Sequence, residues 1–300
     1  MRCLGAARGF GAGAAFSLIA MFLSLALAAG ASPIPAAMSA EAGQASGISP
    51  KPTALPFDPA PPREAEVLYR TGQFLEAAEV ARKRDTAQSL AFAARATLMH
   101  AGYVATGEDA SRELKTGEAL ARAAVEKDPT AVEGLLELVI ALGYLSREEG
   151  YMKAHTDGYG KEAEELIEKA VGLAPDMGWA HAAEGGWNAE IIAKGGSFLG
   201  GLVYGASKKK AIEAFDKAVT LDPGNPTIRI EYAKALIRMQ SKHPDLDKVR
   251  AQLDAALKSP ARTASERIIQ SQGRELMAAL DGGSRRDLVA LVDKLTPFEN

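Results

Sequence analysis

The chain has 300 residues, of which 47% are hydrophobic and 24% are charged, and its formal net charge is -3 at pH 7. Such a chain can bury a sizeable core in one or two domains. Its slightly acidic balance argues against a general nucleic-acid-binding protein, which normally carries a basic excess or a basic stripe. Aromatic residues are sparse at 6%, which favours closely packed helices over a β-sandwich.

Residues 1–31 have the pattern of an export signal. Arg2 and Arg8 precede an uncharged apolar run over residues 10–29, and small residues then form an A-x-A-like cleavage site before Ser32. A run of about 20 apolar residues could also stay uncleaved as a membrane anchor. The sequence therefore predicts an exported protein, most readily in a bacterial periplasm, that is membrane-anchored if the leader is not cleaved.

The next segment is predicted to be a disordered linker. Residues 32–62 hold eight of the fifteen prolines, mixed with Ala, Ser and Gly, and such a tract cannot pack a core. The single cysteine, Cys3, lies in the leader, so the mature chain would have neither disulfides nor thiol chemistry.

From residue 63 onward the sequence repeats one amphipathic pattern, with small or apolar residues at i, i+3 or i+4, and i+7. The clearest copies are residues 76–85, 118–129, 162–175 and 210–223. The last three copies end on Pro129, Pro175 and Pro223, which are spaced by 46 and 48 residues and cannot continue a helix. This spacing predicts an all-α, right-handed α-solenoid of helix pairs over residues 63–260, with capping helices over residues 261–300.

The phrase "AIEAFDKAVTLDPGNPTIRIEYAKAL" resembles the tetratricopeptide (TPR) repeat. The positions that carry the likeness are Ala211, Phe215, Ala218, Leu221, Pro223 and, on the following helix, Tyr232. "YRTGQFLEAAEVARK" near the start of the repeats carries the other half of the motif. The resemblance covers residues 63–260 and is specific for the architecture, but it says little about function.

The units are longer than a TPR unit, which has about 34 residues. They must therefore contain insertions between the two helices of a pair, or lengthened helices. One candidate insertion covers residues 147–160, and the other is a glycine-rich stretch over residues 195–206. Both follow the first helix of a pair, so we expect them on the same edge of the solenoid. We expect the glycine-rich stretch to be flexible at its glycines.

Residues 187–224, from "WNAEIIAKGG" to "AVTLDPG", are also similar to the corresponding part of the regulator-of-microtubule-dynamics family of membrane-anchored TPR-like proteins. In that family, too, a tryptophan-containing helix leads into an insertion before the next helix. Some of its members are associated with membrane contacts and lipid binding, and the resemblance implies the same possibility for this chain.

No catalytic or metal-binding motif is complete. "GLVYGASKKK" has one residue too few between its glycines for a phosphate-binding P-loop, and no strand precedes it. His181 and Glu184 have the i, i+3 spacing of helical metal ligands, but no second pair accompanies them, and packing within the helix pair is the simpler explanation. The sequence therefore predicts a protein that is not an enzyme and needs no cofactor or metal.

The predicted function is that of an exported scaffold or adaptor that binds a protein or peptide partner in its concave groove, and not nucleic acid. The alternative is a lipid-binding or small apolar ligand-binding protein whose pocket surrounds residues 195–206. For the aromatic residues there, simple packing as a lid over the core is a third interpretation. The candidate binding residues are Trp179, Trp187, Phe198, Leu202, Tyr204, Lys208, Lys209, Tyr151, Tyr159 and Tyr232.

Overall fold

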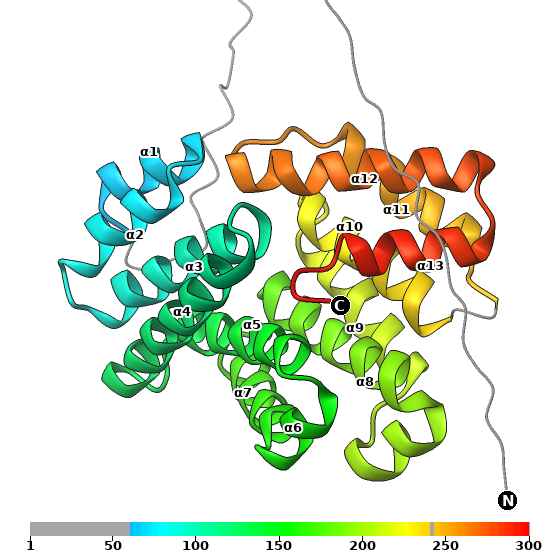
Figure 1. Cartoon of the computed structure of the whole chain (residues 1–300), viewed down its shortest axis with the longest axis horizontal. Helices are drawn as coiled ribbons and strands as arrows, with labels where there is room; N and C mark the ends of the chain where they lie inside the picture. Colours follow the sequence, from blue (N-terminus) through cyan, green and yellow to red (C-terminus); the bar gives the residue numbers. More distant parts are fainter. Residues whose placement is uncertain (1–60, 241–242, 300) are drawn as a thin grey trace, which may run out of the picture. The chain divides into compact units, whose positions relative to one another are not determined.

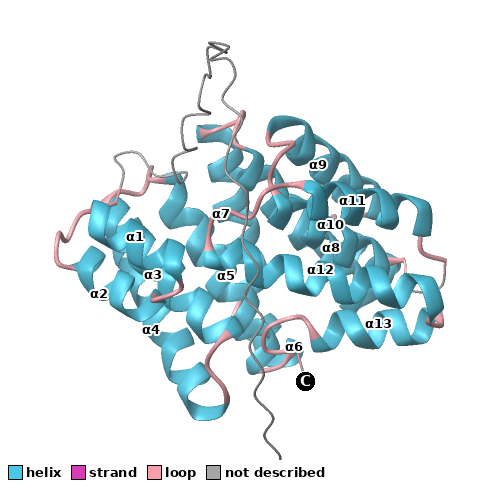
Figure 2. Ribbon diagram, turned by 90° about the horizontal axis from the view of Figure 1, so that it is seen from above, coloured by secondary structure: helices cyan, strands magenta, loops and turns pink. Residues whose placement is uncertain are grey.

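The computed structural model describes residues 61–240 and 243–299, which belong to one compact unit. The predicted signal peptide and all but the end of the predicted linker lie outside the described residues. Every regular element in the described part is an α-helix, and the helices are joined by short loops (Figure 2). The all-α prediction is confirmed.

Thirteen helices occupy the described part of the chain. They are α1 (Arg63–Thr71), α2 (Phe74–Arg82), α3 (Ala87–Tyr103), α4 (Gly107–Lys127), α5 (Val132–Glu148), α6 (Tyr151–Thr156), α7 (Tyr159–Leu173), α8 (Gly178–Tyr204), α9 (Lys208–Leu221), α10 (Pro226–Met239), α11 (Leu246–Lys258), α12 (Ala264–Gly282) and α13 (Arg285–Lys294). Helices α4, α7 and α9 each end two residues before a proline of the repeat, as the sequence predicts.

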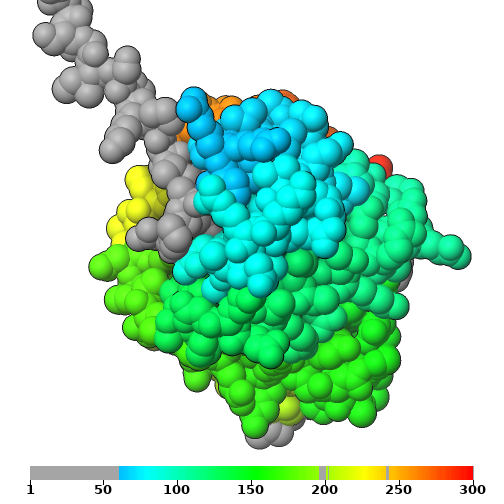
Figure 3. Space-filling view, turned by 90° about the vertical axis from the view of Figure 1, so that its left-hand side faces the viewer, coloured from blue at the N-terminus to red at the C-terminus, as the bar shows by residue number. Residues whose placement is uncertain are grey.

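The helices pack in consecutive pairs, in which we call the first member helix A and the second helix B. The pairs are α1–α2, α3–α4, α5–α7, α8–α9, α10–α11 and α12–α13, and neighbouring A helices also contact each other from α3 through α12. Figure 3 shows the first three pairs stacking in chain order, from cyan to green. This is the solenoid-like arrangement that the repeat predicts.

Helix B of a pair packs through the small and aromatic residues of the repeat. In α9, Ala211 and Ala218 are fully buried and Phe215 is 1% exposed. The ring of Phe215 lies against Gly185 of α8, where an added Cβ would come within 2.5 Å of the ring. Only glycine at this position lets α8 and α9 approach so closely.

The glycine-rich stretch is not a loop between two helices. Residues 195–204 continue α8, and the turn to α9 consists of residues 205–207 only. The predicted insertion at this position is therefore wrong, and helix A of this pair is instead lengthened. The other candidate insertion contains the short helix α6.

Helix α8 must nevertheless change direction along its length. A straight helix would separate the backbones of Trp187 and Tyr204 by about 25 Å, yet the centroids of their rings are 6.1 Å apart. The two side chains are too short to account for the difference between these two distances. Helices kink where glycine and serine adjoin, and the sequence Gly195–Gly196–Ser197 lies between the two rings.

Helix α12 contacts α1 as well as its neighbours α10 and α11. Arg267 donates a hydrogen bond from Nη2 to the carbonyl oxygen of Arg70, at 3.0 Å, and Ala264 shares a buried cluster with Ala65 and Tyr69. The first and last helix pairs are thus in contact.

Candidate functional site

Polar residues are buried on the A helices of this protein and not on the B helices. In the described part of the chain, the buried polar and charged residues are Ser89, Thr97, Glu133, Glu137, His181, Asn188, Lys234, Thr263, Gln270 and Gln272. Each lies on α3, α5, α8, α10 or α12, or at the N-cap of α12. Buried polar groups need partners, and these have them within the fold, as in the hydrogen bond that Gln270 donates to the Ala256 carbonyl at 2.8 Å. We call the surface of the A helices that residues 295–299 contact the groove; it includes Tyr144 and Arg147 of α5, Lys194 of α8, Arg238 of α10 and Gln272 of α12.

Three cationic side chains meet at one end of this groove, and we call them the basic cluster: Arg147 of α5, Lys194 of α8 and Arg238 of α10. Arg238 places Nη1 2.6 Å from an oxygen of Glu190 on α8, and the Nε of Arg147 is 3.4 Å from the other oxygen. The side chains of Arg147 and Arg238 are only 15% and 9% exposed. Ion pairs are less screened when they are buried to this extent.

The neighbouring cations keep the carboxylate of Glu190 ionised. Burial alone would raise its pKa, but Arg147 and Arg238 outweigh burial and hold the pKa of Glu190 below its ordinary value. The hydroxyl of Tyr151 donates a hydrogen bond to the same carboxylate, and burial together with the carboxylate raises the pKa of Tyr151. Glu190 is therefore an anion at neutral pH, and Tyr151 is a neutral donor.

The groove is filled by the end of the chain itself. After α13 the chain turns back toward α5 (Figure 1), and we call residues 295–299 the C-terminal segment. Its Leu295 carbonyl accepts a hydrogen bond from Gln272 Nε2 at 3.2 Å, and its Pro297 carbonyl accepts one from Arg147 Nη1 at 3.3 Å. The segment itself is a tight turn, in which the amide of Glu299 donates to the Thr296 carbonyl at 3.2 Å, and it binds the A helices partly through its main-chain carbonyls.

Two side chains of the C-terminal segment have their own contacts. The ring of Phe298 lies 5.2 Å from the ring of Tyr144 on α5. The carboxylate of Glu299, whose side chain is 8% exposed, pairs with Arg238 at 2.8 Å, with Arg147 at 3.8 Å and with Lys194. One aromatic and one acidic side chain therefore anchor the segment on either side of a single peptide bond.

The backbone at Phe298 is strained. Its φ of +60° lies in the left-handed region, which costs a residue other than glycine about 1–3 kcal/mol where it persists. The contacts on both sides of this residue hold it in that conformation.

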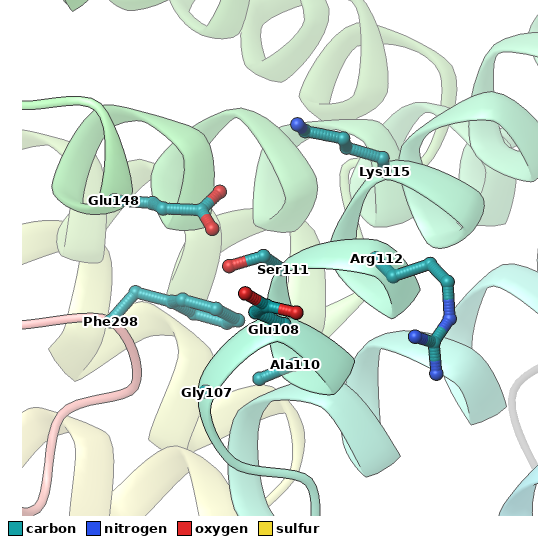
Figure 4. A pocket seen from close by; sticks show the side chains of 8 residues that line it. All are labelled: Gly107, Glu108, Ala110, Ser111, Arg112, Lys115, Glu148 and Phe298. Atoms are coloured by element: carbon teal, nitrogen blue, oxygen red, sulfur yellow. The ribbon is translucent and has the colours of Figure 1, made fainter.

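A shallow hollow of about 660 Å³ adjoins the ring of Phe298 (Figure 4). It is lined by Gly107, Glu108, Ala110, Ser111, Arg112, Lys115, Glu148 and Phe298. The Oε2 atom of Glu148 is buried and has no hydrogen-bond partner among the described residues. Phe298 forms one wall of this hollow, so the hollow and the C-terminal segment belong to one site.

The two candidate insertions meet at a second cluster, which consists of His155, Trp187 and Tyr204 and includes the C-terminal end of α8. The Nδ1 atom of His155 lies 2.6 Å from the hydroxyl of Tyr204, and the indole of Trp187 donates a hydrogen bond from Nε1 to the Gly160 carbonyl at 3.0 Å. The rings of Trp187 and Tyr204 are edge to face. These contacts join α6, α7 and the kinked end of α8.

Trp187→Phe should lower the free energy of unfolding by about 1 kcal/mol, because the Gly160 carbonyl loses its donor. Urea unfolding followed by far-UV circular dichroism measures this change. Tyr204→Phe removes the contact with His155 at a more exposed position and serves as the control, with an expected effect less than half as large. Equal stability of Trp187→Phe and the wild-type protein would mean that the indole bond contributes nothing.

The structure distributes the other predicted site residues over different surroundings. Tyr151 lies in the groove, and Tyr159 donates a hydrogen bond to Glu149 at 3.1 Å. Lys208 and Lys209 are exposed at the start of α9. Trp179 packs partly buried against the core. The side chains of Phe198 and Leu202 lie outside the described residues.

Tyr232 is a core residue and does not line the groove. It is fully buried, its ring stacks on Phe215 with centroids 4.7 Å apart, and its hydroxyl donates to Asp216 at 2.8 Å. The expectation that it contacts a ligand is therefore corrected, because the pattern that marked it as a TPR position describes packing.

Sequence reasoning missed the basic cluster, Glu190 and Glu299. A signal was available, since Glu190 and Arg238 each lie next to apolar residues in a helix, in "AEII" and "ALIRM". A lone charge in such a run indicates a buried ion pair. The sequence does not indicate which opposite charge it meets.

The described residues offer neither a metal site nor a membrane span. No group of three or more His, Cys, Asp or Glu residues there could hold a metal ion. His181 is buried and bonds through Nε2 to the Pro175 carbonyl at 2.9 Å. No helix among the described residues is long and apolar enough to cross a bilayer.

Glu190→Gln should change how stability depends on pH. Because the folded-state pKa of Glu190 is lowered, its ionised form stabilises the fold above the ordinary glutamate pKa of about 4.3, and this contribution disappears as the pH falls through the lowered pKa. The variant should lose about 1.5–3 kcal/mol at pH 7, and less as the pH approaches 3.

Thermal unfolding of both proteins between pH 3 and pH 7 measures this difference. Glu213→Gln, at an exposed position of α9, is the matched control and should shift stability little at any pH. A difference between Glu190→Gln and wild type that does not depend on pH would contradict the prediction.

Comparison with known proteins agrees with this architecture. The family model described as "Regulator of microtubule dynamics protein 1-3" matches residues 63–281. A search of curated proteins found no match. Among solved structures, the chain is similar to the crystal structure of a thermophilic TPR protein of Thermus thermophilus, with a TM-score of 0.51 and 18% sequence identity, over 71% of this chain and 96% of that chain. At this identity the likeness shows the fold alone.

Proposed function

The chain belongs to the regulator of microtubule dynamics protein 1-3 family, and from this premise we propose that it is a non-enzymatic scaffold that binds a short segment of a protein partner. The binding site is the groove along the A helices α3, α5, α8, α10 and α12. TPR-like folds in general serve as protein-interaction scaffolds, and this proposal assigns that role to a particular face of the molecule.

The observation that carries the proposal is the seating of the C-terminal segment. A groove that takes main-chain carbonyls on Gln272 and Arg147, a ring on Tyr144 and a carboxylate on the basic cluster has the features of a site for a short peptide turn. The main-chain bonds and the two side-chain contacts together fix how such a peptide lies.

We also propose that the scaffold works outside the cytoplasm, because the leader has the pattern of an export signal. The partner would then be a periplasmic protein or the exposed part of a membrane protein. The mass of the protein recovered from cells tests this, since cleavage before Ser32 predicts a chain that begins there.

Selection from a displayed random-peptide library tests the proposed function. We would select against the wild-type chain and, in parallel, against a full chain with Phe298→Ala/Glu299→Gln, and then map bound peptides by hydrogen exchange. The expected result is enriched peptides that protect amides of α5, α8 and α10. The B helices α7, α9 and α11 of the same pairs serve as the internal control and should be unaffected.

Two outcomes would contradict the proposal. One is that neither form of the protein enriches any peptide that protects the A helices. The other is that the protein binds phosphatidylglycerol vesicles through the Trp187 and Tyr204 end of α8 while ignoring peptides, which would favour a lipid-binding function.

A further inference from the structure

We propose that the C-terminal segment is an intramolecular ligand that closes the groove, and that the partner supplies the same chemistry: an aromatic residue followed directly by an acidic one. This inference rests on the proposed function, because it names the partner's motif and the regulation of that same groove.

The aromatic half of the motif has a shaped position. The ring of Phe298 lies against Tyr144, beside a hollow that continues past the ring. The preceding Pro297 approaches α3 at Gly102, where an added Cβ would lie 3.1 Å from the proline ring. Glycine at this position leaves room for the chain that carries the aromatic side chain.

The acidic residue of the motif is required by the positive charges that face it. The basic cluster provides three positive charges, and the carboxylates that face it are Glu190 and Asp293, in addition to Glu299 itself. Without Glu299 the site would keep an excess of one positive charge at a place that is mostly buried. Burying an unpaired charge is costly, so the cluster requires an anion from whichever peptide occupies the groove.

The C-terminal segment is also suited to leave. It follows the end of α13 at Lys294 without being part of a helix, and its Phe298 adopts a strained backbone. A ligand tethered by so short a connection has an effective concentration in the millimolar range. A partner must therefore overcome this internal competition before it binds.

Peptide binding in trans tests the inference. The probe is a fluorescein-labelled peptide of sequence LTPFEN, which corresponds to residues 295–300, and the readout is fluorescence polarisation with the full chain. Phe298→Ala/Glu299→Gln releases the internal segment, and it should bind the probe at least about tenfold more tightly than wild type. Thr296→Ala, whose hydroxyl bonds only within its own turn to Val292 in the described contacts, is the matched control and should bind as wild type does.

Two further measurements test the motif. The peptides LTPAEN and LTPFQN should each bind the released protein at least about fivefold more weakly than LTPFEN. With all peptides amidated at the C-terminus, adding Lys194→Gln to the released protein should weaken LTPFEN but leave LTPFQN unchanged, because only the first peptide then offers a carboxylate to the basic cluster. Circular dichroism confirms that each variant is folded, and a chain that ends at Thr296 provides a second released form.

The inference is overturned if the released protein and wild type bind LTPFEN equally, or if LTPAEN and LTPFQN bind as well as LTPFEN. Library-selected peptides that protect the A helices of both forms equally would leave the proposed function standing and remove this inference. If no peptide protects the A helices of either form, the proposed function itself fails.

Discussion

Arg95→Met should lower the free energy of unfolding by about 3–5 kcal/mol, because it leaves a buried carboxylate without its counterion. Arg95 on α3 pairs through Nε with Glu137 on α5 at 2.6 Å, and the side chain of Glu137 is only 1% exposed. Burial already raises the pKa of Glu137 against the opposing effect of Arg95. Urea unfolding at pH 8 measures the loss.

The control for this prediction removes both charges. Replacing a buried ion pair by apolar residues of similar volume is often neutral, so Arg95→Met/Glu137→Leu should recover a good part of the stability lost in the single variant. The loss in Arg95→Met should also be smaller at pH 4.5 than at pH 8, because the unpaired carboxyl group then takes up a proton. A single variant as stable as wild type at pH 8 would show that the pair is dispensable.

Phe215→Ala should lower the free energy of unfolding by about 3–5 kcal/mol, the usual cost of emptying a buried aromatic site. The ring is 1% exposed, stacks on Tyr232 of α10 and fills the space left by Gly185 of α8. One substitution therefore opens a cavity at the junction of three helices. Thermal or urea unfolding of the variant measures the change.

Comparing Gly185→Ala in two backgrounds tests whether Phe215 and Gly185 are in direct contact. Gly185→Ala alone should destabilise the protein, since overpacking of this kind costs about 1–3 kcal/mol. In a Phe215→Leu background the same Gly185→Ala change should cost less, because the smaller side chain leaves room for the added methyl group. Independent, additive effects of the two changes would contradict the direct contact between them.

The two predictions concern two different kinds of contact made by the A helices. Phe215 and Gly185 lie where helix A meets helix B, and there the packing is apolar and close. Arg95 and Glu137 lie among the polar residues of the A helices, as the basic cluster does. This division explains how one repeat can both build a stable stack and present a groove rich in charge.

The helix pairs could be predicted from the sequence because they depend on local patterns. The spacing of apolar residues in α9 marks its buried face, and Ala211, Phe215 and Ala218 are indeed buried. Prolines mark the ends of α4, α7 and α9, since proline cannot continue a helix. Tyr232 belongs to the same pattern, and for that reason it is a core residue and not part of the groove.

The glycine-rich stretch shows where local reasoning fails. Glycine costs about 1 kcal/mol relative to alanine within a helix, which favoured a loop over residues 195–206. In the structure α8 continues to Tyr204, where Tyr204 contacts His155 and Trp187. Tertiary contacts of this kind outweigh a weak intrinsic preference, and the glycines allow the change of direction that these contacts require.

The sequence by itself determined the helix pairs, their ends and their buried faces, because each depends on residues within a few turns of one another. Only the tertiary structure decided the composition of the groove. Arg147, Glu190, Arg238 and Glu299 come from three helices and the C-terminal segment, and their contacts join residues up to 152 positions apart. A charge in the sequence indicates that it needs a partner when buried, but the stacking of the A helices decides which partner it meets.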